Sequence, residues 1–211
     1  MTQSSAALAR KPRADALRNR ERVLEAAKIV FSSGGADASL EAVARRAGVG
    51  IGTLYRHFPT REALYEAVYR REVEHLGELA EQLKNEPEPV DALRRWLGSN
   101  VEFVATKKGM SAALTLAAQA SPELRSYSFD RLTKAASALL GRAVAAGEIR
   151  GYVSPEDLIR ALVGMCYMHD QRGWQHTVLR LLDVFVDGQR LRDGKVGPSK
   201  KSAARKKKRS R

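Results

Sequence analysis

The 211-residue sequence predicts an all-helical fold. Ala, Leu, Arg and Glu dominate the chain, and these residues favour helices. Apolar residues recur three and four positions apart, whereas no segment alternates apolar and polar residues over more than a few positions, as a half-buried strand does. The hydrophobic content of 44% suffices for a core without disulfides, since the single cysteine, Cys166, has no partner within the chain. The positions of glycine, proline and capping residues predict about nine helices.

The first helix is expected over about residues 15–32, where apolar side chains share one face and a glycine pair follows. Residues 1–14 are expected to form a flexible arm. Ser39 is a plausible N-cap for a second helix of about two turns, because its hydroxyl accepts hydrogen bonds from free N–H groups. Gly48 closes that helix.

A third helix is expected from about Gly50 to Phe58. Pro59 interrupts it, since proline has no N–H to donate. Thr60 then caps a longer fourth helix that reaches about residue 83.

Glycine, proline and serine divide the remainder of the chain. A fifth helix is expected from about residue 90, and Lys107-Lys108-Gly109 should separate it from a short sixth helix rich in Ala and Leu. Ser121 and Ser154 each precede a proline, which predicts two further helix starts. Gly173 separates the second of these helices from a last one, over about 174–189.

Charge is distributed unevenly along the chain. The formal net charge is +13, with 11 basic and 6 acidic residues in 1–62, 17 and 18 in 63–194, and 9 and none in 195–211. Two basic ends around a near-neutral middle indicate ends that meet a polyanion and a body that does not. The alternative is that the basic residues bind no polyanion and only keep the protein soluble. Residues 195–211 lack apolar material and are expected to be disordered.

The second and third helices, joined by Ala47-Gly48-Val49, have the form of a helix-turn-helix, in which the second helix lies in a DNA major groove. Leu54 and the apolar face of the second helix are suited to hold the pair against the first helix. The remaining side chains of the third helix are then free to face outward. A two-helix pattern with a central glycine also occurs by chance in helical proteins.

Residues 15–70 resemble the DNA-binding domain of the TetR family of bacterial repressors, most specifically in SLEAVARRAGVGIGTLYRHF followed by a proline and a basic helix start. The resemblance implies a homodimer of all-helical subunits, each with a three-helix DNA-binding domain and a larger domain for ligand binding and dimerisation. The expected division is an arm at 1–14, the helix-turn-helix domain at 15–62, the effector-binding and dimerisation domain at 63–194, and a tail at 195–211.

The resemblance also assigns roles within the motif. Four residues are expected to contact phosphates and thereby position the protein: Ser39, Tyr55, His57 and Arg61. Thr53 and Arg56 are the candidates for base edges, since a guanidinium bridges guanine O6 and N7. Gly50 permits close backbone approach, and Ile51 allows only apolar readout. Each side chain also has a structural alternative: tyrosine is often half buried, and Ser39 is a cap with or without DNA.

The resemblance implies a small-molecule pocket and a dimer interface in the larger domain. The candidate pocket residues are Trp96, Phe103, Met110, Leu114, Tyr127, Phe129, Met165 and Met168. The candidate interface residues are Leu158, Leu162, Trp174, Val178, Leu181 and Phe185. Residues of both sets are more often core than ligand wall. Few charges fall within these faces, which favours an apolar or aromatic effector. Effector binding is expected to release a repressor from a palindromic operator.

Two other function classes compete with this interpretation. An enzyme is disfavoured because Cys166 and His169, with Asp170 adjacent, offer only two possible ligands, too few for a structural zinc site, and no hydrolase or phosphate-loop motif occurs. A ligand-independent or architectural DNA-binding protein, with affinity dominated by the basic tail, stays open. No window approaches eighteen consecutive apolar residues, so we expect a cytoplasmic, nucleoid-associated protein without cofactor or metal.

Overall fold

The computed structural model describes residues 4–34, 38–113, 121–168, 171 and 173–191. Within these ranges the chain is all-helical, as predicted, apart from one isolated bridge between Ile149 and Arg190. The eight helices of the described part are α1 (Ser4–Gly34), α2 (Leu40–Ala47), α3 (Ile51–His57), α4 (Arg61–Leu83), α5 (Pro89–Ala113), α6 (Pro122–Ala145), α7 (Pro155–Tyr167) and α8 (Trp174–Gln189).

The predicted N-caps are confirmed, because a hydroxyl meets a free N–H in the first turn of each of four helices. Ser39 accepts from the N–H of Ala42 at 3.1 Å, and Thr60 accepts from that of Ala63 at 3.1 Å. Ser121 and Ser154 cap α6 and α7 in the same way. Such a cap contributes about 1 kcal/mol to helix stability.

Two predicted boundaries are wrong. The expected break at residues 107–109 does not exist, because α5 runs through it to Ala113. Gly109 is there for close packing: a Cβ at this position would overlap the carbonyl oxygen of Phe31 on α1. Any short helix beyond α5 falls on residues 114–120, which lie outside the described residues. At the N-terminus, α1 begins at Ser4 and so includes most of the expected arm.

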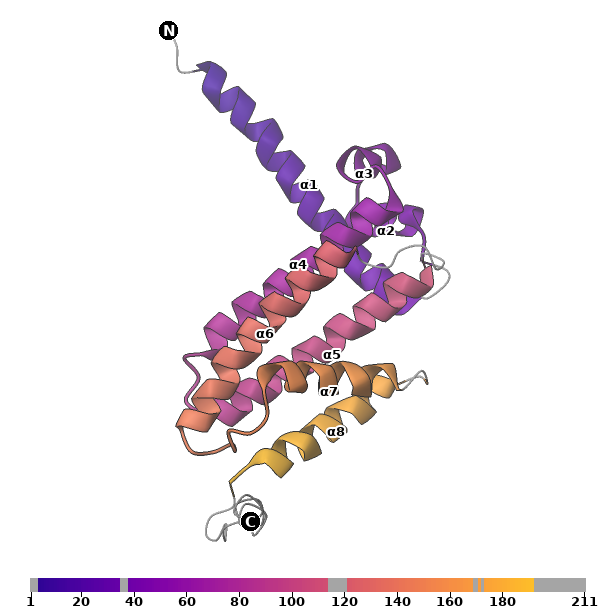
Figure 1. Ribbon diagram of the computed structural model, residues 1–211. Coiled ribbons are helices and arrows are strands. Elements are labelled where there is room, and N and C mark those ends of the chain that lie inside the picture. The colour runs from indigo at the N-terminus through magenta and orange to yellow at the C-terminus, as the bar shows by residue number, and fades with distance from the viewer. Residues whose placement is uncertain (1–3, 35–37, 114–120, 169–170, 172, 192–211) are drawn as a thin grey trace, which may run out of the picture.

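Helix α5 is the central helix of the molecule, since it packs against α1, α4, α6, α7 and α8. Helix α4 runs beside α6, while α7 and α8 form a pair across α5 (Figure 1). Helices α2 and α3 sit at one end of this body and pack against α1. Trp96 marks the centre of the core, where it is fully buried and its Nε1 donates to the carbonyl of Leu76 at 2.9 Å.

Candidate nucleic-acid interface

The turn between α2 and α3 is fixed by backbone geometry. Gly48 adopts the left-handed conformation, with φ of 64°, which glycine enters without steric cost. Its N–H and that of Val49 donate to carbonyls of the last turn of α2, Val49 to Ala44 at 3.0 Å. From α1, the Arg22 guanidinium donates to the Gly48 carbonyl at 3.4 Å, a contact 26 residues away in sequence that the sequence analysis missed. The turn is therefore held from both sides.

Helix α3 is anchored by one side chain. Leu54 is its only buried residue, with an exposed fraction of 0%. Gly50 is the N-cap and its carbonyl accepts from the N–H groups of Thr53 and Leu54. The other residues of α3 are exposed or half-buried, with Ile51 at 40% and Tyr55 at 45% exposure.

The predicted site residues from Gly50 to Arg61 lie on α3 and at the start of α4, whereas Ser39 lies at the start of α2. Ile51, Tyr55 and Arg56 are exposed, whereas Thr53 and His57 are half-buried. Arg61 is the exposed first residue of α4, two positions beyond Pro59.

Ser39 marks the N-terminus of α2, where negative charge is favoured. The pKa of Glu41 lies below its ordinary value, first through its backbone N–H, then through a hydrogen bond from Ser39, with Arg61 adding attraction. The same free N–H groups suit a phosphate oxygen. Arg61 therefore lies close to the start of α2, as joint phosphate binding by Ser39 and Arg61 requires.

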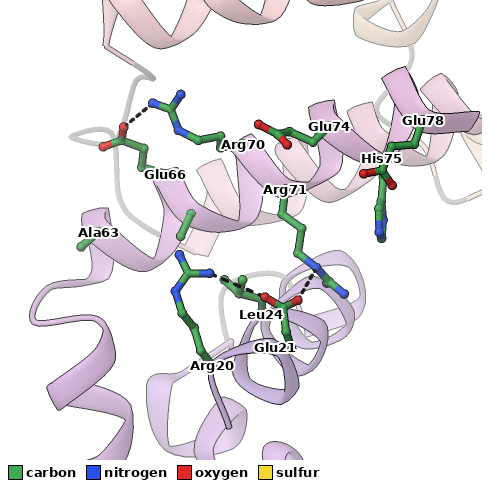
Figure 2. A pocket seen from close by; sticks show the side chains of 11 residues that line it. Arg20, Glu21, Leu24, Ala63, Glu66, Arg70, Arg71, Glu74, His75 and Glu78 are labelled. Atoms are coloured by element: carbon green, nitrogen blue, oxygen red, sulfur yellow. Dashed lines mark hydrogen bonds and ion pairs between the residues drawn. The ribbon is translucent and has the colours of Figure 1, made fainter. Parts of the chain in front are cut away.

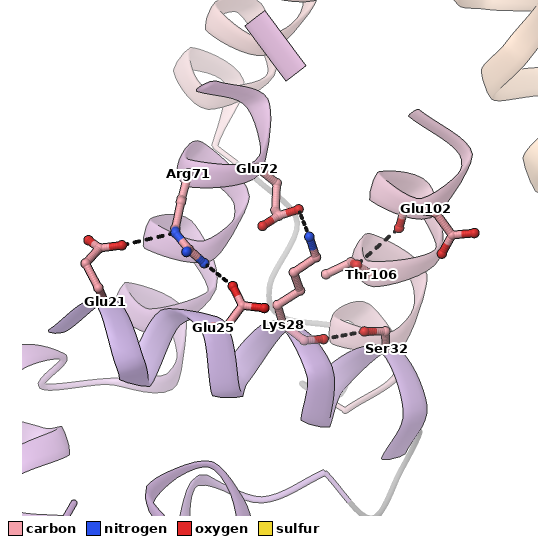
Figure 3. Close-up of polar contacts among 8 residues, drawn as sticks. All are labelled: Glu21, Glu25, Lys28, Ser32, Arg71, Glu72, Glu102 and Thr106. Atoms are coloured by element: carbon pink, nitrogen blue, oxygen red, sulfur yellow. Dashed lines mark hydrogen bonds and ion pairs between the residues drawn. The ribbon is translucent and has the colours of Figure 1, made fainter. Parts of the chain in front are cut away.

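Ion pairs join α1 to α4 behind this surface (Figure 3). Arg71 on α4 contacts Glu21 at 3.2 Å and Glu25 at 2.9 Å, both on α1. Lys28 on α1 contacts Glu72 on α4 at 2.7 Å. Glu72 is buried, so removing one partner of this pair would leave a charge without compensation. These three ion pairs thus join the two helices.

A cleft of about 490 Å³ lies between α1 and α4 on this side (Figure 2). Its walls carry both signs of charge, and several charges neutralise one another: Arg70 contacts Glu66 at 3.0 Å, and Arg71 contacts Glu21. The cleft therefore has no strong net field to select a charged ligand.

The candidate pocket residues do not share one environment. Trp96, Phe103 and Met110 are buried in the core. Tyr127 is half-buried and donates to Glu74 at 2.8 Å, and Phe129 is exposed. Met165 packs against the core from the side, and Met168 is 81% exposed. Leu114 lies outside the described residues.

The candidate interface residues also divide. Leu158, Leu162 and Val178 are buried within this chain, so they are not available to a second subunit. Trp174 and Phe185 are half-buried, and Leu181 is exposed. The apolar side chains that α7 and α8 leave exposed are Val163, Tyr167, Leu181 and Val184, with Val184 at 69%. The spacing of apolar residues predicted that α7 and α8 are apolar helices, but it did not predict which face of each helix is buried within the subunit.

Catalytic and metal chemistry find no support among the described residues. Cys166 is buried, and burial raises its pKa to about 11, the reverse of what a nucleophilic thiol needs. His169 and Asp170 lie outside the described residues. Within the described ranges, no three His, Cys, Asp or Glu side chains are arranged to hold a metal ion. No helix described here is both long and apolar enough to cross a bilayer.

Comparison with known proteins identifies the family. Residues 23–68 match the family described as "Bacterial regulatory proteins, tetR family", and residues 88–191 match "Transcriptional regulator SbtR-like, C-terminal domain". A TetR transcriptional regulator from Streptomyces coelicolor is 42% identical, with a TM-score of 0.72, over 81% of this chain and 98% of that one. The chain belongs to the TetR family. It is a DNA-binding transcriptional regulator, and TetR regulators are not enzymes.

Other TetR proteins are similar over different lengths. A TetR regulatory protein from Mycobacterium vanbaalenii is 33% identical, with a TM-score of 0.67, over 85% of this chain and 99% of that one. The HTH-type transcriptional repressor KstR of Rhodococcus jostii is 30% identical over 128 residues. The match spans 59% of this chain and 59% of that repressor's length.

Proposed function

We propose that the protein is a repressor that binds a palindromic operator as a homodimer and leaves it when a small-molecule effector binds the helical body. The observation that carries the proposal is the exposure of α3: Leu54 alone anchors the helix, and Ile51, Tyr55 and Arg56 face solvent next to the basic start of α4. A core helix of this length would bury more than one of seven residues.

The exposed side chains divide the work between positioning and reading. Ser39, Tyr55, His57 and Arg61 contact phosphates, and the free N–H groups of α2 support the first of these contacts. Arg56 reads a guanine in the major groove and Thr53 reads a neighbouring base, while Ile51 contacts a thymine methyl group. A Cβ at Gly50 would meet no protein atom within 4 Å, so packing within the chain does not require glycine there. Glycine instead lets the backbone approach the DNA closely.

Dimerisation is supported by the apolar side chains that remain exposed on α7 and α8. Val163, Tyr167, Leu181 and Val184 are of the kind that a second copy would cover. We place the interface on these residues, with Trp174 and Phe185 at its edge, in place of the buried Leu158, Leu162 and Val178. A two-fold dimer presents two recognition helices, which is why the operator is expected to be palindromic.

The test is capture of genomic DNA fragments by the purified full-length protein at physiological salt. The wild type should recover fragments that share a palindrome. Arg56→Ala should lose that preference by about 1–3 kcal/mol per half-site, because a bidentate guanine contact is removed. Arg95→Ala is the matched control, since Arg95 is exposed at the opposite end of the body and, among the described residues, forms an ion pair with Glu86.

A truncation that removes residues 195–211 tests the architectural alternative in the same experiment. If the palindrome survives truncation, the helix-turn-helix is the reader and the tail adds only salt-dependent attraction. Diffuse recovery that disappears with the tail would contradict the proposed function. An unchanged sequence preference in Arg56→Ala would contradict the assigned role of α3.

A further inference from the structure

Two consecutive lysines near the end of α5 lie against aromatic rings from other helices. The Lys107 ammonium is 5.6 Å from the ring centre of Tyr69 on α4 and 5.9 Å from that of Tyr167 on α7. Lys108 is 5.6 Å from the Tyr167 ring and 4.7 Å from that of Trp174 on α8. The electron-rich faces of these rings attract a cation but do not neutralise it.

Lys107 differs from Lys28 in its charge partners. Lys28 is half-buried and pairs with Glu72 at 2.7 Å. Lys107 is also half-buried, yet among the described residues no carboxylate lies within ion-pair distance of it. Burial lowers its pKa, and the positive charge of Arg125 on α6 lowers it further. A cation that loses solvation and faces a second cation is poorly compensated within the chain.

Hydroxyl groups complete the surroundings. Tyr69 is buried, which raises its pKa, while a hydrogen bond from Ser128 and the nearby Arg125 act in the opposite direction. Tyr167 is 47% exposed, and its pKa is raised by burial and then by the neighbouring Tyr69. Helices α4, α5, α6 and α7 thus bring two cations and two phenol groups together at a place that solvent reaches.

We propose that these four residues, Tyr69, Lys107, Arg125 and Tyr167, which we name the Lys107 cluster, bind the carboxylate or phosphate group of the effector. An anion there would supply the missing counter-charge to Lys107 and Arg125 and accept hydrogen bonds from the phenol groups. The adjoining aromatic faces suit an apolar or aromatic remainder. The identification of this anion as the effector rests on the proposed function, whereas the site itself does not.

The proposal refines the effector chemistry expected from the sequence. The apolar faces of the body favour an apolar or aromatic effector, with no charged group specified. Lys107 falls at the boundary of those faces, where its hydrocarbon stem is covered and its ammonium meets aromatic rings. The alternative is that the lysines only pack against the rings as a structural contact. The two interpretations differ in whether the Lys107 cluster binds an anion.

Calorimetric titration of the full-length, DNA-free protein separates them. The probes are naphthoate, naphthyl phosphate and the uncharged naphthamide, which share one aromatic body. At least one of the two anions should bind about tenfold or more tightly than the amide, a difference of about 1.4 kcal/mol in binding free energy. Whichever anion binds more tightly then shows whether the site prefers a carboxylate or a phosphate. Equal affinity for all three probes, or saturable binding of none, would overturn the proposal.

Variants of Lys107 assign the binding to the cluster. Lys107→Met keeps the stem and removes the charge, so anion affinity should fall about tenfold or more, whereas Lys107→Arg should retain it. Lys134→Met on α6 is the control, since Lys134 is exposed outside the cluster. Thermal unfolding of each variant verifies folding, and undiminished anion binding by a folded Lys107→Met variant contradicts the site. Because no DNA is present, anion binding by a chain that recovers no operator would support the site and contradict the proposed function.

Discussion

Gly109 offers the sharpest test of how α1 and α5 meet. In Gly109→Ala, the new Cβ would overlap the Phe31 carbonyl oxygen and lie 2.9 Å from the Phe31 carbonyl carbon and 3.2 Å from Cα of Ser32. Carbon atoms in favourable contact are about 3.5–4.0 Å apart. All three atoms belong to the α1 backbone, so no side-chain rotation relieves the clash and the two helices must separate.

The expected loss follows from two opposing effects. Overpacking a close contact lowers the free energy of unfolding by about 1–3 kcal/mol. The upper end applies here because the new Cβ clashes with backbone atoms, which cannot move aside as a side chain can. The gain in helix propensity from Gly to Ala is about 1 kcal/mol. The net loss is therefore about 2 kcal/mol, which in a protein of this size lowers Tm by about 4–8 °C.

The assay is thermal unfolding followed by far-ultraviolet circular dichroism, at one protein concentration because association shifts Tm. Gly141→Ala in α6 is the matched control: nothing lies within 4 Å of its Cβ position, so this variant gains propensity alone and is stabilised by about 0.5–1 kcal/mol. If Gly109→Ala is as stable as Gly141→Ala, the close contact between α1 and α5 is refuted.

Two further predictions concern buried side chains. Leu54→Ala should destabilise the protein by about 2–4 kcal/mol because it removes the single anchor of α3, whereas Ile51→Ala, at a 40% exposed position, should cost less than about 1 kcal/mol; equal losses in urea unfolding would contradict the anchoring role. Burial raises the Cys166 pKa from 9.0 to about 11, so a thiol reagent at pH 8 should label unfolded protein at once and native protein only slowly. Rapid labelling of native protein at pH 8 would contradict the burial. Because the fold favours the neutral thiol, the contribution of Cys166 to the free energy of unfolding is complete below pH 9 and is lost as the pH rises towards 11.

Helix starts were predictable from the sequence because caps are local. Ser39, Thr60, Ser121 and Ser154 each act on an N–H three residues ahead, so a short window of sequence contains the whole interaction. Gly109 shows the limit of that reasoning. A glycine after two lysines resembles a helix end, yet its role is set by Phe31, which is 78 positions away and which no local pattern reveals.

The candidate site was predictable to a similar extent. The outward face of α3 followed from the position of Leu54 in a short amphipathic helix. The proposed dimer face did not follow, because α7 and α8 are apolar on more than one side. Their packing against α5, α6 and each other determines that Leu158 is buried and Val184 is exposed. The sequence placed Lys107 only at an expected break between two helices, and its aromatic surroundings were not predictable because the rings come from helices distant in sequence.

We propose that helix α4 connects the proposed effector site to the DNA surface. It begins with Arg61 beside α2, pairs Arg71 with Glu21 and Glu25 of α1, and carries Tyr69 of the Lys107 cluster. An effector changes DNA affinity only through different affinities for two positions of α4. Because the ion pairs tie α1 to α4, a shift of α4 carries α1 with it, and α1 holds the turn between α2 and α3 through Arg22. In the proposed dimer, small displacements at Tyr69 would thereby change the spacing of the two recognition helices, on which the fit to an operator depends.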